Sequence, residues 1–283
     1  MSAEDLHRFL DRAVIQIDGP DATAFLQGLV TSDVALLKSQ PAQLAGLLSP
    51  QGKVLFEFLI ARSESGYLLD VAEAGAAGLI QRLKMYRLRS KVEIESAPRW
   101  SIFALWRPTV VLPQSGSGGM IFTDPRLHEL GRRALLPDTI VGASQFNYDA
   151  HRISLGIPEG GKDYAFGTLF PHEAMFDQLN GVSFSKGCYV GQEIVARMQH
   201  RGTARSRFLM VTGDGPLPPM GTVVTAGAVP LGAMGSSMGT QGLALIRLDR
   251  LADAYAVKSP VTAGGVALTL AKPPYATFEA PTP

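Results

Sequence analysis

Residues 186–202 read KGCYVGQEIVARMQHRG, and they decide how the rest of the chain is interpreted. The spacing predicts a short helix over residues 191–199, and Gly202 suits the left-handed position that follows a helix end. Cys188 would lie at the start of this helix, where unpaired N–H groups and the charge of Lys186 both favour a thiolate. The stretch therefore predicts a reactive thiol on a bend between glycines. The apolar side chains expected to face the core are Ile194, Val195 and Met198.

Each of these features also has an ordinary structural explanation. A single cysteine is more often a small buried apolar residue than a nucleophile, and a lysine is more often solvated than bound to a ligand. The density of such residues within a dozen positions is what favours a functional site. Gly187 and Gly191 would allow the backbone to approach a ligand closely.

The composition is that of an ordinary globular chain. It has 283 residues, of which 46% are hydrophobic and 18% charged, and this length predicts two or three domains. There are 26 Lys and Arg against 25 Asp and Glu, so no global field would attract a nucleic-acid backbone. The single cysteine excludes an internal disulfide and a self-contained thiolate metal centre. We therefore expect no resident metal and no nucleic-acid partner.

The N-terminal sequence and the hydropathy predict a location. The opening segment, MSAEDLHRFLDRA, contains acids and no apolar core, unlike a signal peptide or an Arg-rich transit peptide. The best apolar run, residues 54–61, is short and contains Glu57, so no membrane span is expected. The sequence therefore predicts a cytoplasmic protein that does not interact with membranes.

Short strands and helices alternate along the first two thirds of the chain. A turn at residues 63–66 would join two strands as a hairpin, and PQSGSGG at residues 113–119 is typical of a flexible loop. Hairpins with interspersed helices favour an antiparallel α+β fold over a doubly wound sheet. The predicted strands are residues 13–17, 54–61, 67–71, 91–95, 100–106 and 131–136, and the predicted helices are residues 22–30, 76–83 and 145–153.

The pattern changes after residue 202 to short apolar runs separated by glycine and proline. No helix is predicted there, and the regular turn signals favour a small β-barrel or sandwich. The glycine-rich residues 232–242 predict a hairpin loop, because they lack the lysine and the following helix of a phosphate-binding loop. We expect an α+β domain over residues 1–203, with a subdomain break near 96–120, and a β-barrel domain over residues 204–283.

The segment KGCYVGQE, residues 186–193, resembles the signature of the YgfZ-type folate-binding proteins, which are relatives of the glycine-cleavage T-protein. The resemblance runs from about residue 9 to residue 207. It implies a T-protein-like domain with antiparallel sheets and helices around a central channel, followed by a small closing barrel. Other segments that agree are DATAFLQGLVTSDV, SPQGKVLFEFLI, YRLRSKVEI, HRISLGIPE and LFPHEAMFD.

The same resemblance implies a ligand and partners. The bound molecule would be tetrahydrofolate or a one-carbon derivative of it. The function would be the maturation or repair of iron–sulfur proteins, so that client or assembly proteins would be the partners. Glu173 matches the T-protein glutamate that holds the pterin, whose adjacent N–H donors a carboxylate can accept side by side.

Further residues are candidates for the folate site. The anionic glutamate tail of a folate requires cations, and Lys186 and Arg197 are the candidates within the motif. Arg87 and Arg89 are weaker candidates. Tyr189 could pack against the flat rings of the ligand. The remaining motif positions are Gly187, Gly191, Gln192 and Glu193.

Three functions remain open at this point. The preferred one is a tetrahydrofolate-binding accessory protein for iron–sulfur protein assembly, with Cys188 as the catalytic thiolate. One thiolate cannot hold a stable cluster alone, because clusters normally take four protein ligands. The second is aminomethyl transfer, although the acid that this chemistry requires falls at about Ser65–Gly66, with Glu64 nearby and Asp70 further on. The third is a folate-liganded scaffold without chemistry of its own.

Overall fold

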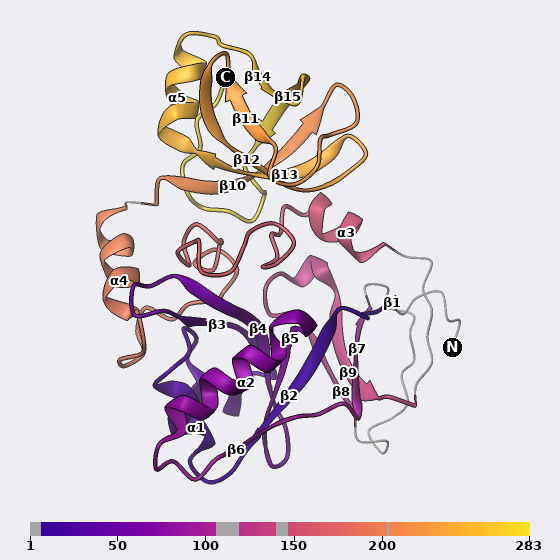
Figure 1. Ribbon diagram of the computed structural model, residues 1–283, viewed down its shortest axis with the longest axis vertical. Coiled ribbons are helices and arrows are strands. Elements are labelled where there is room, and N and C mark those ends of the chain that lie inside the picture. Colours follow the sequence, from indigo (N-terminus) through magenta and orange to yellow (C-terminus); the bar gives the residue numbers. More distant parts are fainter. Residues whose placement is uncertain (1–6, 106–118, 140–146, 203) are drawn as a thin grey trace. The chain divides into compact units, whose positions relative to one another are not determined.

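The computed structural model describes residues 7–105, 119–139, 147–202 and 204–283. The chain divides into two compact units, each with its own elements (Figure 1). The first unit contains Met1–Tyr148 and Leu179–Gln192, and the second contains Asp149–Gln178 and Glu193–Pro283. The division into domains 1–203 and 204–283 remains a prediction.

A five-stranded antiparallel sheet with the order β3-β4-β5-β2-β6 forms the larger part of the first unit. The predicted hairpin is confirmed, because β4 and β5 pair antiparallel. The pair nearest the turn is Arg62 with Tyr67. Helix α2 packs on β2, β5 and β6 and buries Leu79 and Leu83 completely. The elements are β2 (Arg12–Asp18), α1 (Ala22–Gln27), the 3-10 helix η2 (Val34–Lys38), β3 (Ala42–Leu48), β4 (Val54–Arg62), β5 (Gly66–Ala72), α2 (Glu73–Arg87) and β6 (Glu93–Ser96).

A four-stranded antiparallel sheet with the order β1-β7-β9-β8 completes this unit. Phe103, Leu105, Ala134 and Leu136 form its small core. The predicted loop at 113–119, apart from its last residue, lies outside the described residues. The elements are β1 (His7–Arg8), β7 (Trp100–Leu105), β8 (Met120–Thr123), the 3-10 helix η3 (His128–Leu130) and β9 (Arg132–Pro137).

A closed six-stranded barrel with the order β10-β13-β12-β11-β14-β15 dominates the second unit. The predicted small β-barrel is thereby confirmed, and alternating apolar side chains fill it. Its strands are β10 (Ser206–Gly213), β11 (Val223–Ala226), β12 (Val229–Met238), β13 (Gln241–Arg247), β14 (Val261–Ala263) and β15 (Val266–Ala271), and the helices are α3 (Tyr148–Ser154), α4 (Gln192–Arg201) and α5 (Leu248–Ala256).

Helix α5 corrects the prediction that no helix follows residue 202. Leu251 and Ala254 are buried, and Leu248 and Tyr255 pack against the same barrel core. This spacing of three and four residues is that of one helix face. The segment is only nine residues long and lies among strand-like runs, so its periodicity was too short to stand out.

The glycine-rich residues 232–242 are also different from the prediction. They form most of β12 and the start of β13, and only Gly239 and Thr240 make the connection. A Cβ atom on Gly232 would lie 1.9 Å from the carbonyl oxygen of Leu245 on the paired strand. Glycine is therefore present because the strands approach closely, which composition alone cannot distinguish from a loop.

Candidate functional site

Lys186 anchors the motif segment to the first unit. Its side chain is buried, and Nζ donates hydrogen bonds to the carbonyl oxygens of Val30 at 2.8 Å and Ser32 at 2.7 Å. Those two carbonyls belong to the loop after α1, more than 150 residues earlier in the chain. Lys186 therefore uses two of its three ammonium donors inside the protein.

The surroundings of Lys186 shift its pKa. Burial lowers the pKa of the ammonium group to about 8, and the negative charge of Asp33 opposes that shift only partly. Nζ also lies 5.1 Å from the centre of the Tyr189 ring, within reach of a cation–π contact. Burial raises the pKa of Tyr189 to about 12, so its phenol is neutral at physiological pH.

Cys188 lies between these two buried side chains and is itself exposed. Lys186 and Tyr189 point into the protein on either side of it, so the thiol is held outward. A Cβ atom on Gly187 would meet nothing within 4 Å. The structure thus presents a single thiol on an anchored segment four residues before α4 begins.

Gly191 and Gln192 shape the start of helix α4. Gly191 has a φ of +81°, and a Cβ atom there would lie 2.7 Å from the carbonyl oxygen of Ser49. The close approach is therefore to the chain itself. The backbone N–H of Gln192 donates a hydrogen bond to the carbonyl oxygen of Tyr189 at 3.2 Å. The side-chain Oε1 of Gln192 accepts one from the backbone N–H of Tyr189 at 3.3 Å. Gly191 and Gln192 therefore both stabilise the local structure at the start of α4.

Glu173 and Arg197 belong to the second unit. The Glu173 carboxylate is half-buried, and its Oε2 accepts a hydrogen bond from the Phe170 N–H at 2.9 Å. His172 Nε2 lies 3.0 Å from Gln199 Oε1, which ties this segment to α4. Arg197 is exposed on the same helix, so this unit offers a positioned carboxylate and a solvent-accessible guanidinium.

The predicted site residues therefore form two groups. Lys186, Tyr189 and Gln192 contact one another in the first unit, around Cys188. Glu173, Arg197 and Glu193 lie in the second unit, where Glu193 is exposed in the first turn of α4. A pocket shared by Glu173 and Cys188 remains a prediction.

A cavity of about 850 Å³ lies next to the motif segment within the first unit. Ser183, Phe184 and Ser185 line one part of it, and Asp33 and Asp124 line others. It has carboxylates but no lysine or arginine in its lining, so it does not fit the anionic tail of a folate. Among the described residues, no group of three or more His, Cys, Asp or Glu side chains could hold a metal ion.

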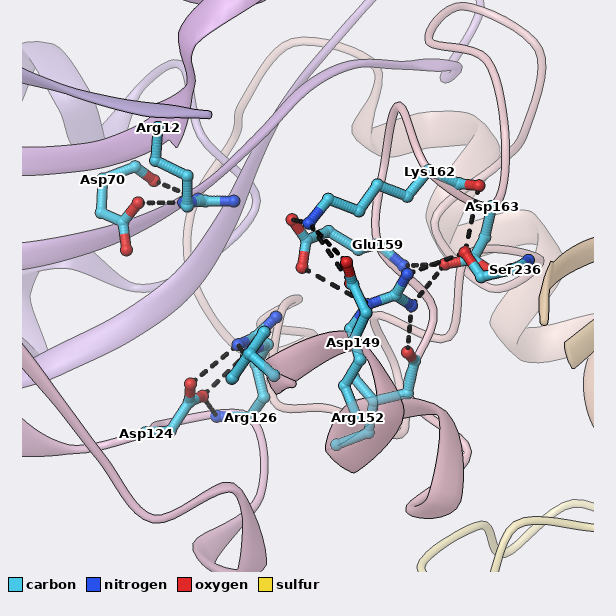
Figure 2. A network of polar contacts seen from close by, with 12 residues as sticks. Arg12, Asp70, Asp124, Arg126, Asp149, Arg152, Glu159, Lys162, Asp163 and Ser236 are labelled. Carbon is cyan, nitrogen blue, oxygen red and sulfur yellow. Dashed lines mark hydrogen bonds and ion pairs between the residues drawn. The ribbon is translucent and has the colours of Figure 1, made fainter. Parts of the chain in front are cut away.

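Sequence reasoning missed a buried ionic network around Arg152 (Figure 2). The guanidinium donates to Asp149 at 2.7 Å, to Asp163 at 2.6 Å and to the Ser236 hydroxyl at 2.7 Å. Asp163 also accepts from the Ser236 N–H at 2.7 Å. The network joins α3 to barrel strand β12 within the second unit. The available signal was an arginine in the apolar HRISLGIPE segment, since a buried arginine requires acidic partners.

A second buried ionic set surrounds Asp70 in the first unit. Asp70 lies in β5, an inner strand, and pairs with Arg12 (Figure 2). It also pairs with Arg133. Nearby, Arg126 donates to Asp124 at 2.8 Å. Burial alone would raise the pKa of Asp124, but Arg126 and Arg133 outweigh it and hold the pKa below its ordinary value. These acids serve the fold of the first unit.

Comparison with known proteins gives one match for the C-terminal barrel and others for most of the chain. The family model described as the CAF17 C-terminal beta-barrel domain matches residues 205–278. The human protein named iron-sulfur cluster assembly factor IBA57, mitochondrial, is 33% identical over an alignment of 279 positions, which covers 85% of this chain and 76% of the human one. The chain belongs to the IBA57 family. The mouse IBA57 protein is 32% identical and covers 88% of this chain and 79% of its own.

A solved structure supports the fold of this IBA57-family protein. The glycine cleavage system aminomethyltransferase T from Bartonella henselae superposes with a TM-score of 0.73, covering 96% of this chain and 86% of that one. At 16% identity the likeness shows the fold alone. The predicted T-protein-like α+β fold with a C-terminal barrel is confirmed.

The predicted cytoplasmic location is wrong on the same comparison, because the human and mouse IBA57 proteins are mitochondrial. The composition of the first residues was therefore a poor guide to location. Among the described residues, no helix is long and apolar enough to cross a bilayer.

The Gly191→Ala substitution tests the close approach at the motif. A left-handed φ and the contact with Ser49 both penalise a side chain, so we expect a loss of about 2 kcal/mol in the free energy of unfolding. The matched control, Gly187→Ala, enters open space and should change it by less than about 0.5 kcal/mol. Urea unfolding of both variants measures this. Equal effects at the two positions would contradict the assignment.

Replacing Lys186 by Met tests the anchor. Loss of the donors leaves two buried carbonyls without a partner, so we expect about 1–3 kcal/mol of destabilisation at pH 7. Because burial lowers the pKa of Lys186 from 10.5 to about 8, the unfolded chain holds this proton more tightly, and wild-type stability should rise from pH 8 to 10. The variant lacks this contribution.

Urea unfolding at pH 7 and pH 9.5 gives the comparison. The difference in stability between the wild type and Lys186→Met should widen at the higher pH, whereas the exposed Lys38→Met control should show no such change. A difference that stays the same or narrows would mean that burial does not lower the pKa of Lys186 in the folded protein.

Proposed function

We propose that this protein is an accessory factor in the assembly of iron–sulfur proteins. The observation that carries the proposal is the 33% identity with the human assembly factor, over 85% of this chain. The superposed aminomethyltransferase T provides the fold but, at this identity, not the activity. The cluster would be the cargo of such a factor and not a resident group.

Cys188 is the residue that we propose as the working thiol. It is the chain's single cysteine, and it is exposed between two buried neighbours that fix its segment. One thiolate provides one of the four ligands that a cluster normally takes. Partner proteins or small thiols would therefore provide the remaining ligands, and the protein would act in a transient complex.

We further propose that the protein binds a reduced folate, as the YgfZ-type segment KGCYVGQE suggests. Glu173 is suited to the pterin edge, because the Phe170 N–H orients the carboxylate and each carboxylate oxygen can accept more than one bond. Arg197 is a better candidate than Lys186 for binding the anionic tail, because Arg197 is exposed on α4. Lys186 already donates two hydrogen bonds to backbone carbonyl oxygens. The folate would contribute a one-carbon carrier.

The assembly role predicts a defined defect for Cys188→Ser. In cells that lack the human relative, this chain, directed to mitochondria, should restore the activity of iron–sulfur enzymes. Cys188→Ser should restore less than about one fifth of it, because a hydroxyl is a far weaker nucleophile and ligand than a thiolate. Ser185→Ala, at an exposed position in the same segment, is the control and should behave as wild type. No rescue by the folded wild-type chain would refute the assembly role.

The folate proposal predicts a specific effect for Glu173→Gln. Losing the charge-assisted bonds to the pterin should weaken tetrahydrofolate binding by about 2 kcal/mol, roughly thirty-fold in Kd. Isothermal titration calorimetry provides the measurement. Glu279→Gln makes the same chemical change at an exposed position outside the motif and should leave the affinity intact. An unchanged affinity in Glu173→Gln would remove this residue from the site.

A further inference from the structure

The chain turns sharply after helix α2 and presents a leucine to solvent. The Ser90 N–H donates to the Arg87 carbonyl oxygen at 2.8 Å, which closes a β-turn over Arg87–Ser90. Leu88, the second residue of this turn, has a φ of +45° and a ψ of −109°. Its side chain is 88% exposed. Figure 1 shows α2 and strand β6, which this turn joins.

This position is unfavourable for a leucine on two counts. The backbone angles match the second position of a type II′ turn, which glycine, asparagine and aspartate dominate. A leucine there is strained, and an exposed leucine gains no burial that would offset the strain. Glycine at this position would therefore make the folded unit more stable than leucine does. The strained, exposed Leu88 therefore points to a contact outside the chain.

Basic side chains surround this leucine. Lys84 and Arg87 lie in the last turn of α2, where the helix dipole favours cations. Arg89 and Lys91 lie beyond the helix, so the dipole does not explain them. Within the part of the chain that the structure describes, none of these four side chains makes an ion pair or hydrogen bond. Met85, also on this turn of α2, is 64% exposed.

The surroundings favour a protein over a membrane or a nucleic acid. Met85 and Leu88 are exposed among these cations, and a phosphate backbone would leave both apolar side chains uncovered. Helices that lie on membranes need a broad apolar face. Here α2 buries its leucines in the core of the unit, and only Met85 and Leu88 are large, apolar and exposed at its end.

We propose that residues 84–91, the α2 tip, form a docking site for an acidic amphipathic segment of a partner protein. The partner's apolar side chains would cover Leu88 and Met85, and its carboxylates would pair with Arg87, Arg89 and Lys91. An open hollow lined by Asp21, Leu88, Arg89 and Ser90 lies at this site. The proposal rests on the proposed function only in that an assembly factor needs partners, and it assigns Arg87 and Arg89 to a partner protein and not to the folate.

Fluorescence anisotropy with a synthetic peptide tests the α2 tip in the full-length protein. The probe is a labelled helical peptide with leucine and phenylalanine on one face and glutamate on the other, and a glutamine version is its control. Arg87→Glu combined with Arg89→Glu should weaken binding at least about ten-fold. Lys258→Glu combined with Lys272→Glu changes the net charge equally at exposed positions of the second unit and should have less than about a two-fold effect.

Two leucine variants separate docking from a structural role. Leu88→Gly removes the side chain and the strain, so it should weaken peptide binding about ten-fold and raise the Tm by roughly 2–4 °C. Leu88→Ala removes the side chain but keeps the strain, so it should weaken binding equally and leave the Tm unchanged. A lower Tm in Leu88→Gly would assign the leucine to the fold and overturn the proposal.

Other outcomes would overturn it as well. Equal binding of the glutamate and glutamine peptides would exclude an acidic partner. Binding to phosphatidylcholine–phosphatidylserine vesicles or to single-stranded DNA, with no binding to the peptide, would identify a lipid or nucleic-acid surface. Tetrahydrofolate titration of Leu88→Gly and Leu88→Ala distinguishes this failure from that of the proposed function, because neither variant changes a candidate folate residue and both should keep wild-type folate affinity.

Discussion

The ammonium group of Lys186 is the interaction on which the candidate site depends. It connects the motif segment to two carbonyls, of Val30 and Ser32, that follow helix α1. Burying a charge is unfavourable unless hydrogen bonds and a polarisable neighbour offset the loss of water. The two carbonyls and the face of Tyr189 provide this compensation. The segment is thereby fixed at the residues on both sides of Cys188, and the thiol is left at the surface.

Much of the local structure could be predicted from the sequence, because it depends on neighbouring residues. The helix expected at residues 191–199 is α4, and the left-handed residue after it is Gly202, with a φ of +58°. The roles of long-range contacts could not be predicted. Lys186 was expected in solvent or on a ligand, since its carbonyl partners lie more than 150 residues away. Gly191 was expected to approach a ligand, but it approaches the carbonyl oxygen of Ser49.

The acidic residues show the same limit. The sequence pattern indicated only that Asp70 follows the position expected for the aminomethyl-transfer acid, whereas its strand is paired on both sides and its carboxylate contacts two arginines. In the second unit Arg152 donates hydrogen bonds to Asp149 of α3 and to Asp163 of the following loop. It also donates one to Ser236 of β12. Such networks need partners from several elements, and only the fold brings these together. These ionic networks stabilise the two units and do not include Cys188. The thiol therefore has no structural role in them.

The proposal that a reduced folate binds beside the thiol of Cys188 is tested most directly by ligand protection. The rate of Cys188 alkylation by iodoacetamide would be measured by mass spectrometry, with and without saturating tetrahydrofolate, under anaerobic conditions. A ligand that covers the thiol should slow alkylation roughly ten-fold or more. Saturation demonstrated by calorimetry together with an unchanged alkylation rate would contradict the account, because the folate and the thiol would then occupy separate places.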